Sequence, residues 1–174
     1  MVSQSHCNST ASTGERVAHH NTLLFNAQGI YFMKKYELVI KSMKVFGYNK
    51  LYRIRALKSF GDVQEGDIGG WIEKESNLSH QGDAWVFDNA WIYGNASVSG
   101  DAMVYGKAHI SGNARISGYA SVSGNVSVSG NAAVSDNVII TGNSVINDDV
   151  KISGHARISG QARIVKCNNK HMPA

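Results

Sequence analysis

Residues 94–111 read GNASVS-GDAMVY-GKAHIS, three hexads in succession with a small residue at position three and Val or Ile at position five. The pattern runs without an insertion from Gly82 to Val165, which makes fourteen hexads. Position three is Ala, Val or, once, Ser, and position five is Val or Ile in every copy. A fixed period this short is typical of a solenoid, in which stacked repeats bury their apolar residues against one another.

The spacing within a hexad indicates a short strand followed by a corner. Positions three and five are two residues apart, so on an extended strand they share one face, and position four points outward. Positions six, one and two are mostly Ser, Gly, Asn or Asp, which tolerate the backbone conformations of a corner. Three such sides make a coil of eighteen residues, so the hexads predict an all-β fold, a single-stranded parallel β-helix of about 4.7 coils.

Residues eighteen apart are expected to stack in columns along this β-helix. One corner column consists of Asn95, Asn113, Asn131 and Asp149, and another of Ser99, Ser117, Ser135 and Ser153. Identical polar side chains on stacked parallel strands can hydrogen-bond along the column. We therefore interpret both columns as structural ladders.

The chain divides into four parts. Residues 1–32 are polar and aperiodic, which is typical of a disordered extension or of a start codon assigned upstream of Met33. Residues 33–81 are expected to form a small N-terminal β cap, because a β-helix has unpaired backbone groups at its end. The β-helix itself covers 82–165, and a C-terminal tail covers 166–174.

Within the cap, residues 36–40 and 51–57 are rich in strand formers and are separated by a turn signal at 46–49. Gly69-Gly70-Trp71 is interpreted as a tight turn that leads into the first coil, with a ligand-binding loop as the alternative. Arg53 and Arg55 share one strand face, where they are either solvated or contact an acidic partner.

Charge and composition exclude several classes of protein. The net charge is +4, but residues 82–165 hold five Lys or Arg against six Asp or Glu, so the repeat has no long basic stripe and nucleic acid binding is not expected. No apolar stretch approaches the ~20 residues of a membrane span, and no signal peptide is visible. The two cysteines have no metal or redox spacing, and we expect a cytoplasmic protein with no metal and no membrane partner.

An aliphatic residue followed four positions later by a small one, as in Val98 and Ala102 or Ile110 and Ala114, resembles the hexapeptide-repeat superfamily of β-helices. The resemblance implies triangular coils, a left-handed course and frequent homotrimers. Residues 60–72, Asn77-Leu78-Ser79 and residues 82–86 are similar to the lead-in segment of the YdcK family. That family comprises bacterial and prophage-borne β-helix proteins, often labelled acyl- or acetyltransferases.

The superfamily resemblance also implies what a catalytic version would need. Acyltransferases of this fold use a histidine as general base, with acyl-CoA lying between neighbouring subunits. His109, at an outward position, is the candidate here, and His155 lies at a corner. The coils carry no long inserted loop, and no C-terminal helix follows them, which counts against catalysis. A zinc site of three histidines is not expected, because no His-x4-His spacing occurs in the repeat.

The outward positions also suggest a binding surface. Candidate interface residues are Trp85, Trp91, Met103, Tyr105, Ile139 and Arg157. Exposed apolar patches mark interfaces, so this face favours a homotrimer or a protein partner. The alternative is that residues 34–75 cover Trp85 and Trp91. The sequence thus predicts a non-catalytic scaffold or interaction protein without a cofactor, phage- or prophage-encoded on the family's pattern, and the alternative is a transferase that uses acetyl-CoA or another acyl-CoA.

Overall fold

The computed structural model describes residues 23–25 and 31–166, and the chain separates into two compact units at Met33. In the first unit, β1 (Leu23–Phe25) pairs antiparallel with β2 (Tyr31–Met33). The second unit begins at Lys34 and contains the cap and the repeat.

The repeat forms fourteen strands of two residues each, one for every hexad, as the spacing predicts. They are β6 (Trp85–Val86), β7 (Trp91–Ile92), β8 (Ser97–Val98), β9 (Met103–Val104), β10 (His109–Ile110), β11 (Arg115–Ile116), β12 (Ser121–Val122), β13 (Ser127–Val128), β14 (Ala133–Val134), β15 (Ile139–Ile140), β16 (Val145–Ile146), β17 (Lys151–Ile152), β18 (Arg157–Ile158) and β19 (Arg163–Ile164). Each strand covers positions four and five of its hexad, and the remaining four residues turn the corner.

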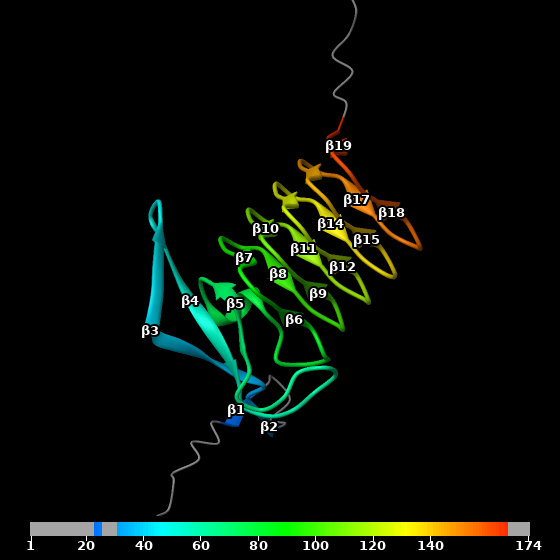
Figure 1. Cartoon of the computed structure of the whole chain (residues 1–174). Coiled ribbons are helices and arrows are strands. Elements are labelled where there is room, and N and C mark those ends of the chain that lie inside the picture. Colours follow the sequence, from blue (N-terminus) through cyan, green and yellow to red (C-terminus); the bar gives the residue numbers. More distant parts are fainter. Residues whose placement is uncertain (1–22, 26–30, 167–174) are drawn as a thin grey trace, which may run out of the picture. The chain divides into compact units, whose positions relative to one another are not determined.

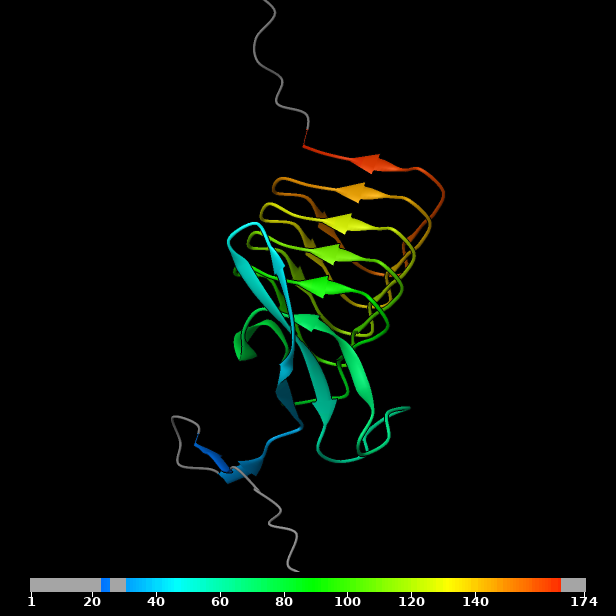
Figure 2. The same ribbon diagram turned by 60° about the vertical axis from the view of Figure 1, so that its left-hand side comes forward.

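The strands stack into three parallel sheets, one for each side of the coil (Figures 1 and 2). His109 pairs with Trp91 in the coil before it and with Ser127 in the coil after it, so the register is eighteen residues. The other two sheets keep the same register, as between Ser121 and Ile139. The predicted all-β fold with parallel stacked coils is confirmed.

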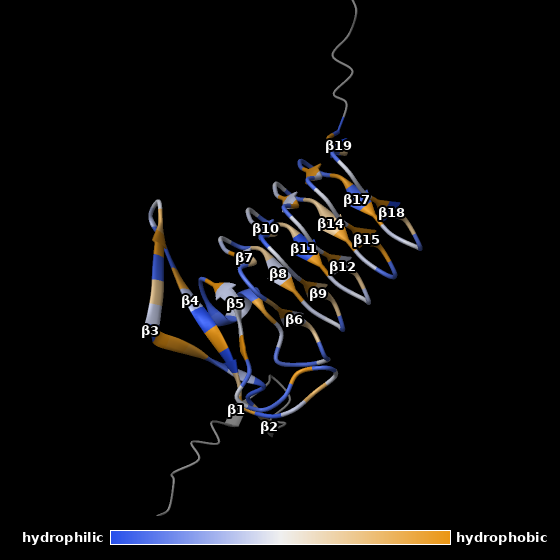
Figure 3. Ribbon diagram, viewed as in Figure 1, coloured by the Kyte–Doolittle hydropathy of each residue, from blue (hydrophilic) through white to orange (hydrophobic). Residues whose placement is uncertain are grey.

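The interior is filled by positions three and five, which are buried together. Ala114 and Ile116 are fully buried, and so are their equivalents up to Ile146. Apolar strand residues alternate with polar corners along the whole stack (Figure 3). Because Ala is short and Ile is long, the two positions fill a narrow interior without forcing the strands apart.

The corners depend on the first position of each hexad, which has a positive φ angle throughout. Gly118 has φ +67°, and Asp136, where the next coil has Asp instead of Gly, has φ 61°. The Asp136 carboxylate accepts a hydrogen bond of 2.9 Å from the backbone N–H of Gly154 in the coil above. Asp tolerates this conformation better than most residues, and the added bond compensates for part of the strain.

The asparagine column is a hydrogen-bonded ladder, as predicted. Its amide groups donate in one direction along the stack, from Asn95 to Asn113, from Asn113 to Asn131, and from Asn131 to Asp149, over 2.8–3.2 Å. The cap extends it, because the Lys74 ammonium donates to Asn95 at 3.2 Å.

The cap consists of β3 (Tyr36–Phe46), β4 (Asn49–Ala56), β5 (Ile68–Ile72) and one 3-10 turn, η1 (Glu75–Asn77). Strands β3 and β4 form an antiparallel hairpin, and β5 pairs antiparallel with β4 and parallel with β7. The cap therefore joins the eight-stranded sheet of the solenoid, in the order β3, β4, β5, β7.

The prediction of a turn at Gly69-Gly70-Trp71 is wrong, because these residues form strand β5. The glycines are needed for close packing rather than for a turn. A Cβ on Gly70 would lie 2.7 Å from the carbonyl oxygen of Ala90, and one on Gly69 would lie 2.6 Å from that of Val86. Only glycine lets this strand approach the first coil closely enough to pair with it.

Candidate functional site

The N-terminal end of the solenoid is closed on all three sides by polar groups of the cap. On one side the backbone N–H groups of Trp71 in β5 and of Glu73, just after β5, donate to the first coil at 2.9 and 3.1 Å. On the second side the Asn77 amide donates to the carbonyl oxygens of Gly94 and Ala96 at 3.2 and 2.7 Å. This edge of the stack is therefore unavailable to another chain.

Lys35 closes the third side. Its ammonium donates to the carbonyl oxygens of Gly82 and Ala84 at 3.0 and 2.8 Å and lies 4.8 Å from the centre of the Phe60 ring. The residue is 1% exposed, and burial lowers the pKa of its ammonium to about 8. The nearby Asp83 carboxylate opposes that shift. Lys35 is thus a buried structural cation.

Next to Lys35 lies a buried stack of Tyr36 on His80, whose ring centres are 4.3 Å apart. The Tyr36 hydroxyl bonds the carbonyl oxygens of Glu75 and Leu78, and Nδ1 of His80 accepts the backbone N–H of Lys35 at 3.2 Å. Burial raises the pKa of Tyr36, with a smaller contribution from Glu75. Burial also lowers the pKa of His80, which outweighs the attraction of the Glu75 carboxylate 3.9 Å away.

His80 is expected to make the chain less stable at mildly acidic pH. An unfolded histidine titrates near pH ~6.5, whereas folded His80 takes up its proton only at lower pH. The unfolded state therefore binds more protons between these two values, and the free energy of unfolding falls as the pH drops through that window. Urea unfolding at a series of pH values from 8 to 5 measures this fall in the free energy of unfolding.

The matched variants for this measurement are His80→Gln and His155→Gln. His155 is exposed at a corner, so its replacement controls for the loss of one histidine from the chain. His80→Gln should flatten the pH dependence of the free energy of unfolding. The pH dependence that remains should arise from His109, whose pKa is also lowered by burial. An unchanged slope in His80→Gln would show that His80 does not titrate in the folded chain as described.

The outward side of the eight-stranded sheet carries a column of aromatic rings that the cap clasps. Trp71, Trp91 and His109 are in register, and the Trp91 and His109 rings stack with centres 4.7 Å apart. The Lys44 ammonium lies 4.3 Å above the Trp71 ring, and the Arg53 guanidinium lies 4.5 Å from it. These cation–π contacts hold the hairpin against β5, and the Lys44 ammonium also lies 5.6 Å from the ring of Trp91 in the first coil.

His109, the candidate general base, is therefore a member of an aromatic stack. Burial is the single cause that lowers the pKa of its ring, and no carboxylate of the described residues acts on it. A catalytic histidine needs a group that fixes its tautomer and a substrate within reach of its free nitrogen. The structure gives His109 a stacking partner, Trp91, and no such orienting group among the described residues.

Trp85 does not belong to an exposed surface. It is 1% exposed, because Tyr36 and Phe60 pack against it edge-on with ring centres 6.1 and 5.4 Å away. Trp91 is half-buried under Phe46, and the centres of the two rings are 5.1 Å apart. The cap thus covers both tryptophans, which is the alternative that the sequence left open.

The remaining interface candidates lie beyond the cap. Met103 and Ile139 are half-buried on the same sheet, and Arg157 at the end of that sheet is exposed. Tyr105, at the adjoining corner, donates its hydroxyl hydrogen to the Met103 sulfur at 2.7 Å and stacks on Phe87. The face therefore keeps two partly exposed apolar residues, Met103 and Ile139, with Ser121 between them in the column.

The cap is held on the solenoid by Lys35, Asn77 and Arg53, and the sequence predicted no structural role for the first two. Arg53 was noted as a solvated residue or a contact for an acidic partner, but it bonds the carbonyl oxygens of Gly69 and Asp88. The sequence signal for Asn77 is its place within the family's lead-in segment. Lys35 has no periodic or motif signal at all.

Two further findings concern ligands. Within residues 23–25 and 31–166, no group of three or more His, Cys, Asp or Glu side chains is placed to hold a metal ion. No helix in that part of the chain is long and apolar enough to cross a membrane.

Comparison with known proteins identifies relatives of the repeat. A family model described as the YdcK β-solenoid repeat matches residues 108–124. The chain is also 34% identical, over 64 residues, to a protein named uncharacterized acetyltransferase YdcK from Escherichia coli (strain K12). That alignment covers 32% of this chain and 19% of the relative, so the chain matches about a fifth of the relative's length. Both findings confirm the family resemblance seen in the sequence.

Proposed function

From the premise that this chain is a YdcK-like β-solenoid protein, we propose that it acts as a non-catalytic scaffold that assembles with copies of itself and binds another protein. The observation that carries the proposal is the environment of His109, whose ring is stacked on Trp91 and has no orienting carboxylate in the described part of the chain. The repeat around it runs through fourteen strands with no inserted loop to form a substrate pocket. Stacked rings and regular corners stabilise a rod rather than build a reaction site.

A homotrimer is the form of assembly that we propose. Met103 and Ile139, on either side of Ser121, supply the apolar contacts, and the Tyr105 hydroxyl contacts Met103 from the corner. Both side chains are half-buried in a single chain, so a neighbour can cover what remains exposed.

Ile139→Asp is expected to lower the oligomeric state without unfolding the chain, because assembly would have to desolvate the new carboxylate. Sedimentation velocity gives the oligomeric state and circular dichroism checks the fold. Arg115→Asp, a charge change on a different sheet, is the control and should leave the assembly intact. An Ile139→Asp protein with the mass of the wild type would exclude this face as the interface.

The alternative function is an acyl-CoA-dependent transferase with its site between subunits, and the printed name of the relative favours it. In that case acetyl-CoA should bind the folded chain and stabilise it. At a ligand concentration of 100 times Kd, binding adds about 2.7 kcal/mol to the free energy of unfolding.

Thermal unfolding with increasing acetyl-CoA separates the two functions. We expect a melting temperature that does not change with acetyl-CoA, with the same result for His109→Ala. Coenzyme A and ATP serve as controls for nonspecific anion effects. A saturable rise with acetyl-CoA that His109→Ala abolishes would replace the scaffold by the transferase.

A further inference from the structure

The C-terminal end of the solenoid is open, in contrast to the capped N-terminal end. Strands β17, β18 and β19 are each the last strand of their sheet. The series of backbone bonds between coils ends with Asn147, whose N–H donates to the carbonyl oxygen of Ile164 at 3.1 Å. The N–H and C=O groups of the last coil that point along the stack, away from the coil below, therefore have no coil to pair with among the described residues. Unpaired strand edges of this kind are templates for an added strand.

No described residue forms a further coil over the interior of the last one. Ile140 and Ile146 are fully buried in the coil below, whereas Ile152, Ile158 and Ile164 are half-buried. Their upper surfaces would be covered by the inward residues of one more coil. At every lower level of the stack, the next coil covers such an apolar interior and pairs with the three strand edges around it.

The hexad pattern of the sequence does not extend past Val165. In the next hexad, 166–171, the inward positions three and five would be Asn168 and Lys170. A further coil needs apolar residues at these two positions, because a polar side chain there would be buried without partners.

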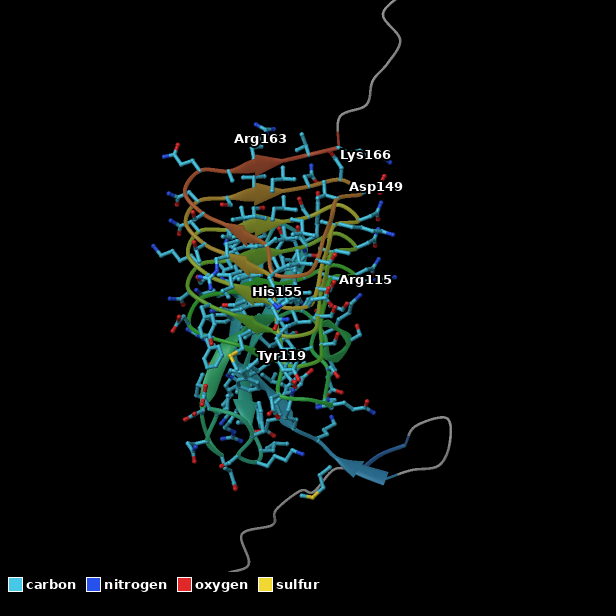
Figure 4. The ribbon with its side chains drawn as sticks, turned by 90° about the vertical axis from the view of Figure 1, so that its right-hand side faces the viewer. Arg115, Tyr119, Asp149, His155, Arg163 and Lys166 are labelled. Carbon is cyan, nitrogen blue, oxygen red and sulfur yellow. The ribbon has the colours of Figure 1, made fainter. Side chains whose placement is uncertain are left out.

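Charge at this end changes abruptly between two coils. The outward residues of the penultimate coil are Ala133, Ile139 and Val145, and those of the last coil are Lys151, Arg157 and Arg163. All three of the latter are exposed, and so is Lys166, whose ammonium lies 3.5 Å from Asp149. Figure 4 shows Arg163, Lys166 and Asp149 together at the end of the stack. One cation therefore marks each of the three sheet edges.

A second copy of the chain does not fit this end. Two C-terminal ends placed together would oppose two sets of these cations, which is unfavourable. The N-terminal end of another copy is closed by its own β5, Asn77 and Lys35, so it offers no edges for pairing. Charge complementarity instead favours a segment that carries carboxylates at its outward positions.

We propose that the open C-terminal coil is a docking site for an extended acidic segment of another protein, which adds to the strand edges and covers Ile152, Ile158 and Ile164. Its carboxylates would lie above Lys151, Arg157 and Arg163, at the same eighteen-residue register that relates the coils. The inference rests on the scaffold function, for which it names the class of partner. The cations also keep the edges from pairing with other copies, so the end is selective.

The probe is a synthetic eighteen-residue peptide with three copies of Gly-Asn-Ala-Glu-Val-Ser, which has the pattern of one added coil. Its matched control carries Lys in place of each Glu. Binding to the full chain is followed by NMR of the isoleucine methyl groups. We expect saturable shifts at Ile152, Ile158 and Ile164, with the Glu peptide binding about tenfold more tightly than the Lys peptide, because exposed ion pairs contribute modestly each. Added salt should narrow that difference.

The charge-reversed chain Lys151→Glu, Arg157→Glu, Arg163→Glu makes the test decisive, since it alters exposed side chains and leaves the interior intact. It should prefer the Lys peptide. Equal binding of both peptides, or no binding, overturns the proposal. So does binding that appears only after residues 167–174 are removed, because the chain's own residues would then occupy the end. Methyl shifts that depend on protein concentration alone would assign the end to a second copy. Stabilisation by acetyl-CoA would overturn the scaffold function and leave the peptide result unaffected.

Discussion

Replacing Gly118 by alanine is expected to lower the free energy of unfolding by about 3 kcal/mol, from left-handed backbone strain and overpacking together. Gly118 has φ +67°, and a Cβ there would lie 2.6 Å from the backbone nitrogen of Asp136 and 2.9 Å from its Cα. The contact is with backbone of the next coil, so no side chain can rotate away from it. The coils must separate locally, which weakens the bond between Tyr119 N–H and the Asp136 carbonyl oxygen.

Gly154→Ala is the matched control for this substitution. Gly154 has φ +79°, but a Cβ there meets nothing within 4 Å, because it lies in the last coil. It should therefore lose only the strain contribution, about 1 kcal/mol. Urea unfolding followed by circular dichroism measures both. Equal losses for the two variants would mean that the close approach of the coils has no energetic consequence.

Lys35→Met is expected to destabilise the chain by about 2–3 kcal/mol, because two carbonyl oxygens lose a charged donor in a buried place. The carbonyl oxygen of Ala84 is one of the two, and it accepts from the Lys35 ammonium at 2.8 Å in a buried position. Methionine has a similar length and fills most of the space. The loss is smaller than the hydrogen bonds alone suggest, since the variant no longer buries a charge.

Lys34→Met controls for the loss of a lysine at the same place in the chain. The Lys34 ammonium pairs at 2.5 Å with Glu75, whose side chain is 41% exposed, and such pairs contribute up to about 1 kcal/mol.

The buried Lys35 ammonium should also make the stability of the chain depend on pH. Its folded pKa of about 8 lies below the ordinary value, so the unfolded state binds more protons above pH 8. The stability of the wild type should therefore rise relative to Lys35→Met between pH 8 and about 10. If Lys34→Met and Lys35→Met had equal stability across this range, the description of Lys35 as a buried cation would be contradicted.

The repeat was predictable from the sequence because its contacts are periodic. Ala114 and Ile116 face inward for the same reason as every other pair, so one hexad reports on all of them. The asparagine ladder follows from the same period, since residues eighteen apart must stack. The corner conformation was predictable as well, because Gly or Asp begins every hexad.

The cap was only partly predictable because its contacts are long-range and occur once. Gly69-Gly70 has the composition of a turn, and only the approach of the first coil explains why it is a strand. Trp85 occupies an outward position by its period, yet Tyr36, nearly fifty residues earlier, covers it. No local pattern shows that Lys35 reaches the carbonyl oxygens of Gly82 and Ala84.

For the candidate site residues, the sequence predicted which way each side chain points but not which residues surround it. His109 lies outward on its strand, as its period requires. Its stack on Trp91 depends on the register between coils, which the period predicts, but the clasp by Lys44 and Phe46 depends on the hairpin. The basic residues near the C-terminal end were visible in the sequence, whereas their even distribution over the three sheet edges became apparent in the structure.

The central claim, a self-assembling scaffold that does not use acyl-CoA, is tested most directly by the solution mass of the full chain with and without acetyl-CoA. Light scattering should give the mass of three chains of 18.8 kDa each in both conditions. A monomer in both conditions, or a trimer that forms only with acetyl-CoA, would contradict it.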